Sequence, residues 1–203
     1  MTGDTNRIAG VFVRDLQGGV TTLVSVGARS AAQPSGAIMD TPVMTPDGRF
    51  VAFSSSALDL VNAAQTDYLE VYVRDVLLGQ TFWASTNLAS GTTAVSFAPA
   101  LSDDGRFVSF KTTTGGNSWP WLLRRDLHTG QLDVISTNMA GIGPIVPDSY
   151  GPVMTPDGRL VAFTERPSAD HRSSVWLWDA QTQTASVASV HGRQRRILSA
   201  RPG

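Results

Sequence analysis

The segment Val43–Phe53 reads VMTPDGRFVAF, and the segment Val153–Phe163 reads VMTPDGRLVAF. Only one of the eleven positions differs, although the two copies begin 110 residues apart. A third and looser copy contains SDDGR at Ser102–Arg106. Each turn follows a short apolar stretch after a proline and precedes an apolar strand, which is FVAF, FVSF or LVAF. A stretch that recurs in this way predicts a repeat architecture.

A second motif ends in an aspartate and occurs four times, as VFVRD, VYVRD, LLRRD and VWLWD. Ten residues after each aspartate stands a serine that closes the next strand. The pairs are Asp15 and Ser25, Asp75 and Ser85, Asp126 and Ser136, and Asp179 and Ser189. The combined motifs predict units of four strands: A before the DGR turn, B after it, C ending in the aspartate, and D ending near the serine.

The composition of the turns and strands supports this division. Proline presets the first corner of a turn, and glycine accepts the left-handed conformation that a bulged hairpin requires. We therefore expect positive φ at Gly48, Gly105 and Gly158. The strands are rich in aromatic and β-branched residues. No window has an apolar period of about 3.6 residues, so no long helix is predicted.

The sequence TPDGRFVAF followed by VYVRD resembles the Pro-Asp repeats of TolB-like, WD-type β-propellers, over about residues 4–190. The resemblance implies an all-β fold, a β-propeller segment of four-stranded antiparallel blades. About three and a half blades are expected: a half blade at 4–26, blades at 27–86, 87–137 and 138–190, and a flexible basic tail at 191–203. Since the first unit begins with strand C, we expect an open arc that self-associates, or a piece of a larger propeller.

Composition excludes several classes of function. The chain has no cysteine and a net charge of −1, which excludes disulfides and thiolate metal sites and argues against a nucleic-acid partner. No apolar stretch approaches the ~20 residues of a membrane span, and the N-terminal sequence lacks a secretory signal pattern. The family that the chain resembles is often extracytoplasmic in bacteria, but no signal peptide is predicted in the chain. The sequence therefore assigns no compartment.

The charged residues of the repeat are interpreted as structural. Asp47, Asp104 and Asp157 recur at one turn position, whereas a catalytic acid is normally unique. The three histidines, His128, His171 and His191, form no metal or catalytic motif and are expected at the surface. We therefore predict no catalytic residue, no metal and no cofactor. The charges of the RD pairs are expected to pair within or across blades, and Trp178, which replaces the arginine in the last unit, predicts a different outer neighbour there.

In an antiparallel blade, the A–B and C–D turns lie on one face, and the B–C and D–A connections lie on the other. We name these the turn face and the variable-loop face. The connections on the variable-loop face differ in length and carry the candidate binding residues Tyr68, Trp119, Tyr150, Arg166 and His171. Variable loops on a rigid scaffold are where binding usually occurs.

The sequence therefore predicts a non-catalytic interaction module that binds a protein or peptide through the variable-loop face. The alternatives are the propeller portion of a larger enzyme, either a gating domain like that of prolyl oligopeptidases or a sugar-acting propeller, and a truncated remnant without independent function. No catalytic domain is recognisable in the 203 residues.

Overall fold

The computed structural model describes residues 10–28, 30–31, 42–63, 68–86, 88, 95–113, 121–136, 146–147, 151–166 and 174–190. These residues form strands and turns, and none of them lies in an α-helix. Accordingly, none of the described segments is a helix of the length and apolar character that a membrane crossing would require. The all-β prediction is confirmed.

The strands form consecutive antiparallel sheets, which we number I to IV. Sheet I is the hairpin β1 (Phe12–Arg14) and β2 (Thr21–Leu23). Sheet II contains β4 (Val43–Met44), β5 (Phe50–Ser55), β7 (Glu70–Asp75) and β8 (Gln80–Trp83). Sheet III contains β9 (Val95–Leu101), β10 (Phe107–Thr113), β11 (Trp121–Asp126) and β12 (Leu132–Val134). Sheet IV contains β14 (Val153–Met154), β15 (Leu160–Arg166), β16 (Ser174–Asp179) and β17 (Thr184–Val190), and β13 (Val146–Pro147) pairs with the far end of β15.

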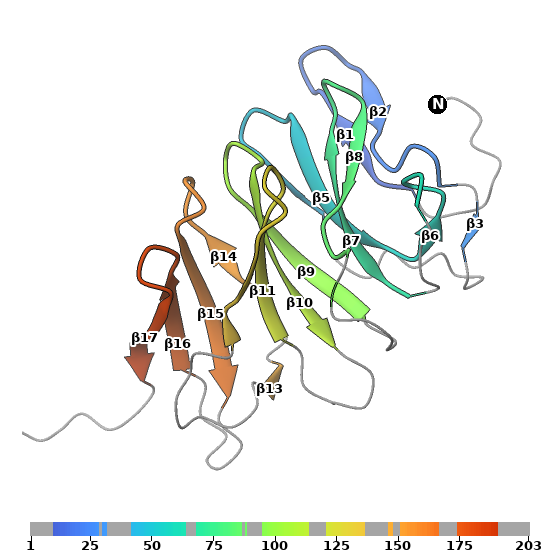
Figure 1. Cartoon of the computed structure of the whole chain (residues 1–203). Helices are drawn as coiled ribbons and strands as arrows, with labels where there is room; N and C mark the ends of the chain where they lie inside the picture. The colour runs from blue at the N-terminus through green and yellow to red at the C-terminus, as the bar shows by residue number, and fades with distance from the viewer. Residues whose placement is uncertain are drawn as a thin grey trace, which may run out of the picture.

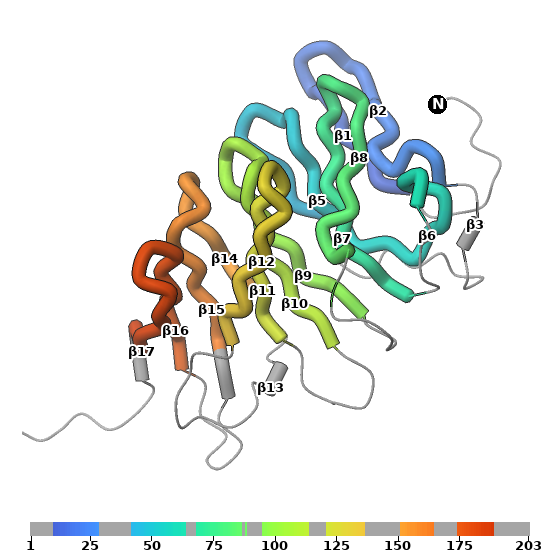
Figure 2. Tube along the Cα trace, in the orientation of Figure 1, coloured from blue at the N-terminus to red at the C-terminus, as the bar shows by residue number. Residues whose placement is uncertain are grey.

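The four sheets follow one another side by side in chain order, as Figures 1 and 2 show. A small ladder of β3 (Ser30–Ala31) and β6 (Ala57–Leu58) lies beside sheets I and II. The DGR turns and the C–D turns lie at one end of the sheets, and strands B end and strands C begin at the other. Strand order A-B-C-D within sheets II and III agrees with the predicted units.

The hydrophobic core consists of three clusters, each of which lies in the seam between two successive sheets. Val11 and Val24 of sheet I pack with Val51, Phe53 and Tyr72 of sheet II. The second cluster joins sheets II and III, and the third joins sheets III and IV. Because successive residues of a strand point to opposite faces, each inner sheet contributes side chains to two clusters. The apolar strands are therefore buried on both faces, which explains their continuous runs of apolar residues.

The repeated serines close the sheets through their side chains. The Ser25 hydroxyl accepts a hydrogen bond from the Val11 backbone N–H at 3.1 Å, and the Ser85 hydroxyl accepts one from Val71 at 3.0 Å. The Ser136 hydroxyl accepts the corresponding hydrogen bond, at 3.3 Å, from the Leu122 backbone N–H in β11. In sheets I to III, the constant spacing thus reflects a side chain that continues the ladder where strand D has ended, whereas Ser189 of sheet IV lies within β17.

The glycine of each DGR turn has the positive φ that the sequence predicted. The values are +74° at Gly48, +70° at Gly105 and +71° at Gly158. Side chains with a Cβ rarely adopt this region because the Cβ approaches the backbone carbonyl oxygen. The turn therefore requires glycine at this position.

A second constraint applies to Gly105 and Gly158, the turn glycines of sheets III and IV. The phenylalanine that begins strand B of one sheet packs its ring against the turn glycine of the next sheet. A Cβ built on Gly105 would lie 2.2 Å from the ring of Phe50, and one built on Gly158 would lie 2.4 Å from the ring of Phe107. The absence of a side chain therefore sets how closely two sheets approach at the turn face.

The outer faces of the two end sheets are less well covered than the equivalent faces inside the arc. Phe12 of sheet I is 55 % exposed, whereas Tyr72, the equivalent residue of sheet II, is 1 % exposed. Val175 of sheet IV is 37 % exposed, whereas its equivalent Val71 is fully buried. Apolar faces of this kind favour association with another sheet.

We predict that replacing Gly158 by alanine destabilises the fold more than replacing Gly48. Both changes strain a positive φ, at about 1–2 kcal/mol. Gly158→Ala adds a clash with the Phe107 ring, whereas the nearest atom to a Cβ at Gly48 is the Met44 sulfur at 3.9 Å. Overpacking adds about 1–3 kcal/mol. Equal losses of stability in chemical denaturation would show that the ring contact contributes little.

We also predict that the chain of 203 residues self-associates through its end faces. Light scattering behind a sizing column should report dimers or larger species. Phe12→Ser and Val175→Ser should each reduce the mass, because they remove apolar surface from an end face. Leu77→Ser, which changes a 74 % exposed residue in a C–D turn, is the matched control and should leave the mass unchanged. A wild-type monomer with a sharp melt would contradict the prediction.

Candidate functional site

The structure describes only part of the predicted binding set. Tyr68 lies just before β7, at the B–C end of sheet II, and is 38 % exposed. Arg166 is the last residue of β15, so its backbone lies at the same end of sheet IV, and its side chain is not described. Trp119, Tyr150 and His171 lie outside the described residues. The predicted cluster therefore stays a prediction.

The residue after Tyr68 connects this part of the variable-loop face to the core. Leu69 is 5 % exposed, and its carbonyl oxygen accepts a hydrogen bond of 2.7 Å from the Ser96 backbone N–H of sheet III. Ser96 in turn donates from its hydroxyl to that of Thr112, at 3.1 Å. Tyr68 thus leaves a rigid seam with its ring partly in solvent.

The DGR turns on the opposite face satisfy their own polar groups. In the first of them, the Thr45 hydroxyl donates to Asp47 at 2.6 Å, and the same carboxylate accepts the Arg49 backbone N–H at 3.0 Å. The Thr45 hydroxyl also accepts the Phe50 N–H at 3.0 Å. Ser102 and Asp104, and Thr155 and Asp157, make the same bonds in the other two turns. The hydrogen bonds from Thr45 and Thr155 hold the pKa values of Asp47 and Asp157 below their usual range.

The arginine of each DGR turn binds the aspartate at the end of strand C in the same sheet. The N···O distances are 2.7 Å for Arg49 and Asp75, 2.7 Å for Arg106 and Asp126, and 2.6 Å for Arg159 and Asp179. The Oδ1 atom of each of these aspartates also accepts hydrogen bonds from backbone N–H groups of the C–D turn. One carboxylate therefore holds two turns together.

These ion pairs lower the pKa values of the aspartates. The Arg49 guanidinium lowers the pKa of Asp75, and the Arg106 guanidinium lowers that of Asp126 far below its usual range. Hydrogen bonds from Arg159 lower the pKa of Asp179 to about 2. Asp75, Asp126 and Asp179 are thus ionised partners of turn arginines at neutral pH.

The arginines that precede the strand-C aspartates bind elsewhere. Arg14 donates to the Thr21 hydroxyl at 2.8 Å, and Arg74 donates to Thr81 at 3.0 Å. Arg125 reaches across the seam to the Thr86 carbonyl oxygen of sheet II, at 2.5 Å. Arg14 and Arg74 thus bind strand D of their own sheet, and Arg125 also bonds across the seam to the preceding sheet.

The prediction for Trp178 was wrong. Trp178 does not contact a different outer neighbour, because its side chain is fully buried in the cluster between sheets III and IV. It packs there with Val161 and Phe163 of its own sheet and with Leu122 and Ile135 of sheet III. The equivalent Arg125 of sheet III reaches toward the preceding sheet, and the Trp178 indole likewise lies in the seam with its preceding sheet.

Arg124 breaks the repeat inside this seam. The equivalent residues of the other sheets are Val13, Val73 and Leu177, whereas Arg124 and its partner Asp133 form a buried ion pair at 2.6 Å with side chains 8 % and 6 % exposed. The Arg124 Nε–H donates to the Gly158 carbonyl oxygen at 2.7 Å. Its guanidinium carbon lies 3.9 Å from the centre of the Phe107 ring. Arg124 therefore links sheet III directly to the DGR turn of sheet IV.

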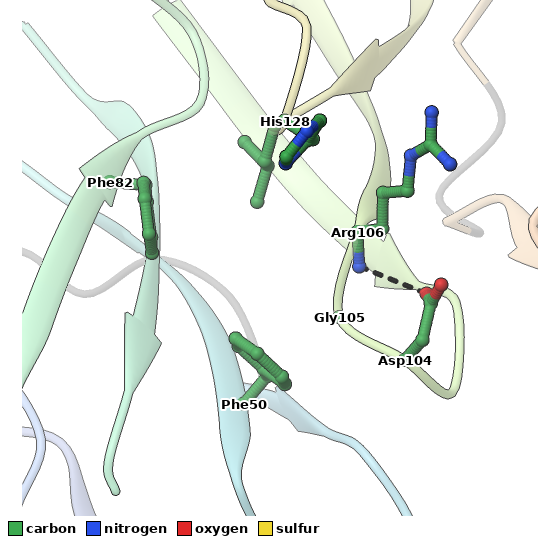
Figure 3. Close-up of a pocket in the computed structure, with 7 residues that line it drawn as sticks. Phe50, Phe82, Asp104, Gly105, Arg106 and His128 are labelled. Atoms are coloured by element: carbon green, nitrogen blue, oxygen red, sulfur yellow. Dashed lines mark hydrogen bonds between the residues drawn. The ribbon is translucent and has the colours of Figure 1, made fainter. Parts of the chain in front are cut away.

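A pocket of about 350 Å³ opens between sheets II and III on the turn face. Figure 3 shows Phe50 and Phe82 of sheet II on one side and the DGR turn of sheet III with His128 on the other. The full lining is Phe50, Phe82, Asp104, Gly105, Arg106, Leu127 and His128. His128 is exposed, as the sequence predicted.

Sequence reasoning missed this pocket and the role of Arg124. A signal was present for Arg124, because an arginine stands where three other strands carry Val, Val and Leu. No comparable signal marked Phe50 or Phe82, which look like ordinary strand residues until the next sheet is placed beside them. Among the described residues, no three histidine, aspartate or glutamate side chains gather closely enough to hold a metal ion.

No family model and no curated protein sequence matches the chain. Similar solved structures include TolB from Acinetobacter baumannii, with a TM-score of 0.51 and 17% identity over 89% of this chain and 38% of that one. The fold is that of a β-propeller segment.

Two enzymes share the fold. Oligogalacturonate lyase from Vibrio parahaemolyticus matches with a TM-score of 0.51 and 14% identity, over 89% of this chain and 46% of that one. Dipeptidyl peptidase 4 from Porphyromonas gingivalis matches with a TM-score of 0.54 and 11% identity, over 88% of this chain and 28% of that one. This chain therefore spans less than half the length of each protein, and at these identities the similarity is one of fold alone.

We predict that acid weakens the fold through the Arg–Asp pairs. A carboxylate whose pKa is lowered in the folded state stabilises that state above its unfolded pKa of about 4. For Asp179 this contribution is lost as pH falls from there toward about 2. The melting temperature should drop across this interval. Arg159→Met should reduce the drop, whereas Arg14→Met, which removes only a bond to Thr21, should not. An unchanged drop in Arg159→Met would mean that the pair is not responsible.

Proposed function

We propose that the chain is a non-catalytic β-propeller interaction module that binds a protein or peptide through its variable-loop face. The observation that carries the proposal is a contrast between the two faces. On the turn face, the repeated Asp and Arg side chains are bound to one another. On the variable-loop face, Tyr68 leaves a rigid seam with 38 % of its surface exposed.

The residue types of the predicted set support this choice. Aromatic residues and arginine dominate the energetics of protein interfaces, often at about 2 kcal/mol or more for each anchor. Tyr68, Trp119, Tyr150, Arg166 and His171 differ from one connection to the next, so they can discriminate between partners. The repeated turns present the same groups in each sheet and can discriminate little.

The proposal is tested by selecting peptides from a display library on the immobilised chain and measuring their affinities by fluorescence anisotropy. Tyr68→Ala and Trp119→Ala should each weaken a selected peptide by at least about tenfold, because an anchor ring is lost. The melting curve should stay nearly unchanged. Leu77→Ala, a control on the turn face that is also an exposed apolar residue, should retain full affinity.

Two results would contradict the proposal. If Leu77→Ala weakens binding and the two aromatic variants do not, the partner binds the turn face. If Tyr68→Ala and Trp119→Ala unfold the chain instead, these rings pack in the seams and form no site.

A second candidate function is suggested by the comparisons: the segment could serve as the propeller portion of an enzyme. The proteins that share the fold include a dipeptidyl peptidase and an oligogalacturonate lyase. In that case the isolated chain should bind peptide or oligogalacturonate fragments without turning them over, and activity should require a further domain. Selection of peptides that bind at the variable-loop face, with no binding of oligogalacturonate, would favour the interaction module.

A further inference from the structure

The seams between the sheets contain a position that is filled in one seam and empty in another. The position lies over the phenylalanine that begins strand B and beside the DGR glycine of the next sheet. Between sheets III and IV it is occupied by the side chain of Arg124. Between sheets II and III the equivalent strand-C residue is Val73, which is too short to reach it, and the pocket opens there.

Four groups surround the Arg124 guanidinium. The Phe107 ring lies against it at 3.9 Å, the Trp178 ring lies at 5.7 Å, the Gly158 carbonyl oxygen accepts its Nε–H at 2.7 Å, and Asp133 pairs with it at 2.6 Å. A guanidinium is suited to such a site because it is planar, stacks on aromatic rings and carries donors in a fixed geometry. Phe107 also has Arg106 at 4.8 Å, so the ring contacts two guanidinium groups.

The pocket between sheets II and III repeats part of this arrangement without the inserted arginine, and Arg125 stands there at the position of Trp178. Phe50 takes the place of Phe107, Gly105 takes that of Gly158, and Phe82 takes that of Asp133. The Arg49 guanidinium lies 4.7 Å from the centre of the Phe50 ring, and that of Arg106 lies similarly over Phe107. Among the described residues, no second guanidinium contacts the Phe50 ring as Arg124 contacts Phe107. Within the same described part of the chain, no donor reaches the Gly105 carbonyl oxygen.

We propose that the pocket between sheets II and III binds the side chain of an arginine from a partner peptide. The guanidinium stacks on Phe50 and donates to the Gly105 carbonyl oxygen, as Arg124 does with Phe107 and Gly158 in the next seam. It also contacts the edge of Phe82, which lies across the pocket from Gly105 (Figure 3). This site lies on the turn face and is independent of the proposed variable-loop site.

The charged side chains of the pocket leave one carboxylate oxygen available to an incoming donor. Arg106, which lines it, is already paired with Asp126. Asp104, also in the lining, uses its Oδ1 atom for the Ser102 hydroxyl and the Arg106 N–H, which leaves Oδ2 for an incoming donor. Since Phe82 replaces the buried carboxylate, the pocket depends on two rings and a partly solvated acid. Its volume of about 350 Å³ accommodates one long side chain.

The experiment uses saturation-transfer difference NMR on the whole chain, which tolerates self-association. The probes are N-acetyl-arginine amide, N-acetyl-citrulline amide and N-acetyl-lysine amide. Citrulline has the shape of arginine without its charge. We expect the arginine probe to bind at least about fivefold more tightly than the citrulline probe, the effect of one cation–π contact. The lysine probe should bind more weakly than arginine because an ammonium does not stack.

The key variant is Val73→Arg combined with Phe82→Asp, which copies the Arg124–Asp133 pair into sheet II. The copied pair should fill the pocket from within and abolish binding of the arginine probe while the chain stays folded. Phe50→Leu is the second variant, because sheet IV carries Leu160 at this position. It should reduce arginine binding to the level of citrulline. Tyr68→Ala should leave arginine binding unchanged, which separates this site from the variable-loop face.

Three results would overturn the proposal. They are no binding of the arginine probe, equal binding of the citrulline probe, or undiminished arginine binding in the variant with the copied pair. If that variant does not fold, undiminished arginine binding in Phe50→Leu has the same meaning.

Discussion

The contact between a turn glycine and the phenylalanine of the preceding sheet sets the spacing of the seams between sheets II and III and between sheets III and IV. Only glycine can hold a φ near +70° and also let a ring pack where a Cβ would stand. The close approach brings the turn of sheet IV within reach of sheet III, where the Asp103 N–H donates to the Pro156 carbonyl oxygen at 2.8 Å. Sheets III and IV are thereby each positioned by the sheet before them, as expected when repeats contact only their neighbours.

The ionic network of the turns complements this contact within each sheet. The Thr or Ser hydroxyl orients the turn aspartate, and the turn arginine binds the strand-C aspartate, which in turn caps the C–D turn. Because surface pairs contribute little individually, their value lies in connecting two turns through one carboxylate. The network also leaves few unbound charges on the turn face, so the chemistry available there is concentrated in the pocket between sheets II and III.

Arg124 shows what happens when one position departs from the repeat. A buried ion pair is costly to desolvate and is favourable only if the remaining donors are also satisfied. Here the Gly158 carbonyl oxygen and the Phe107 ring provide those partners. The pair ties sheet III to one particular turn, whereas apolar residues at the same position in sheet II leave a space open to solvent. The same backbone position thus produces a closed seam in one place and a pocket in another.

Much of the architecture could be predicted from the sequence, because it depends on local chemistry that recurs. The DGR glycines, the alternating strands and the spacing from aspartate to serine each report a hydrogen bond or a φ value within one unit. They predicted the all-β fold and the strand order within the inner sheets. The Arg–Asp partners were only partly predicted, because an arginine beside an aspartate in the sequence points to the opposite face of the strand.

The candidate pocket and the placement of Trp178 were decided by tertiary structure alone. Phe50, Gly105 and His128 belong to separate motifs, and only the packing of sheet II against sheet III brings them together. Trp178 was predicted to have a different outer neighbour because it replaces the arginine of the repeat, but the sequence does not show that this face of the strand meets sheet III. Contacts between sheets depend on how closely two backbones approach. That distance is set by side chains far apart in the sequence, so it does not appear in the pattern of any single unit.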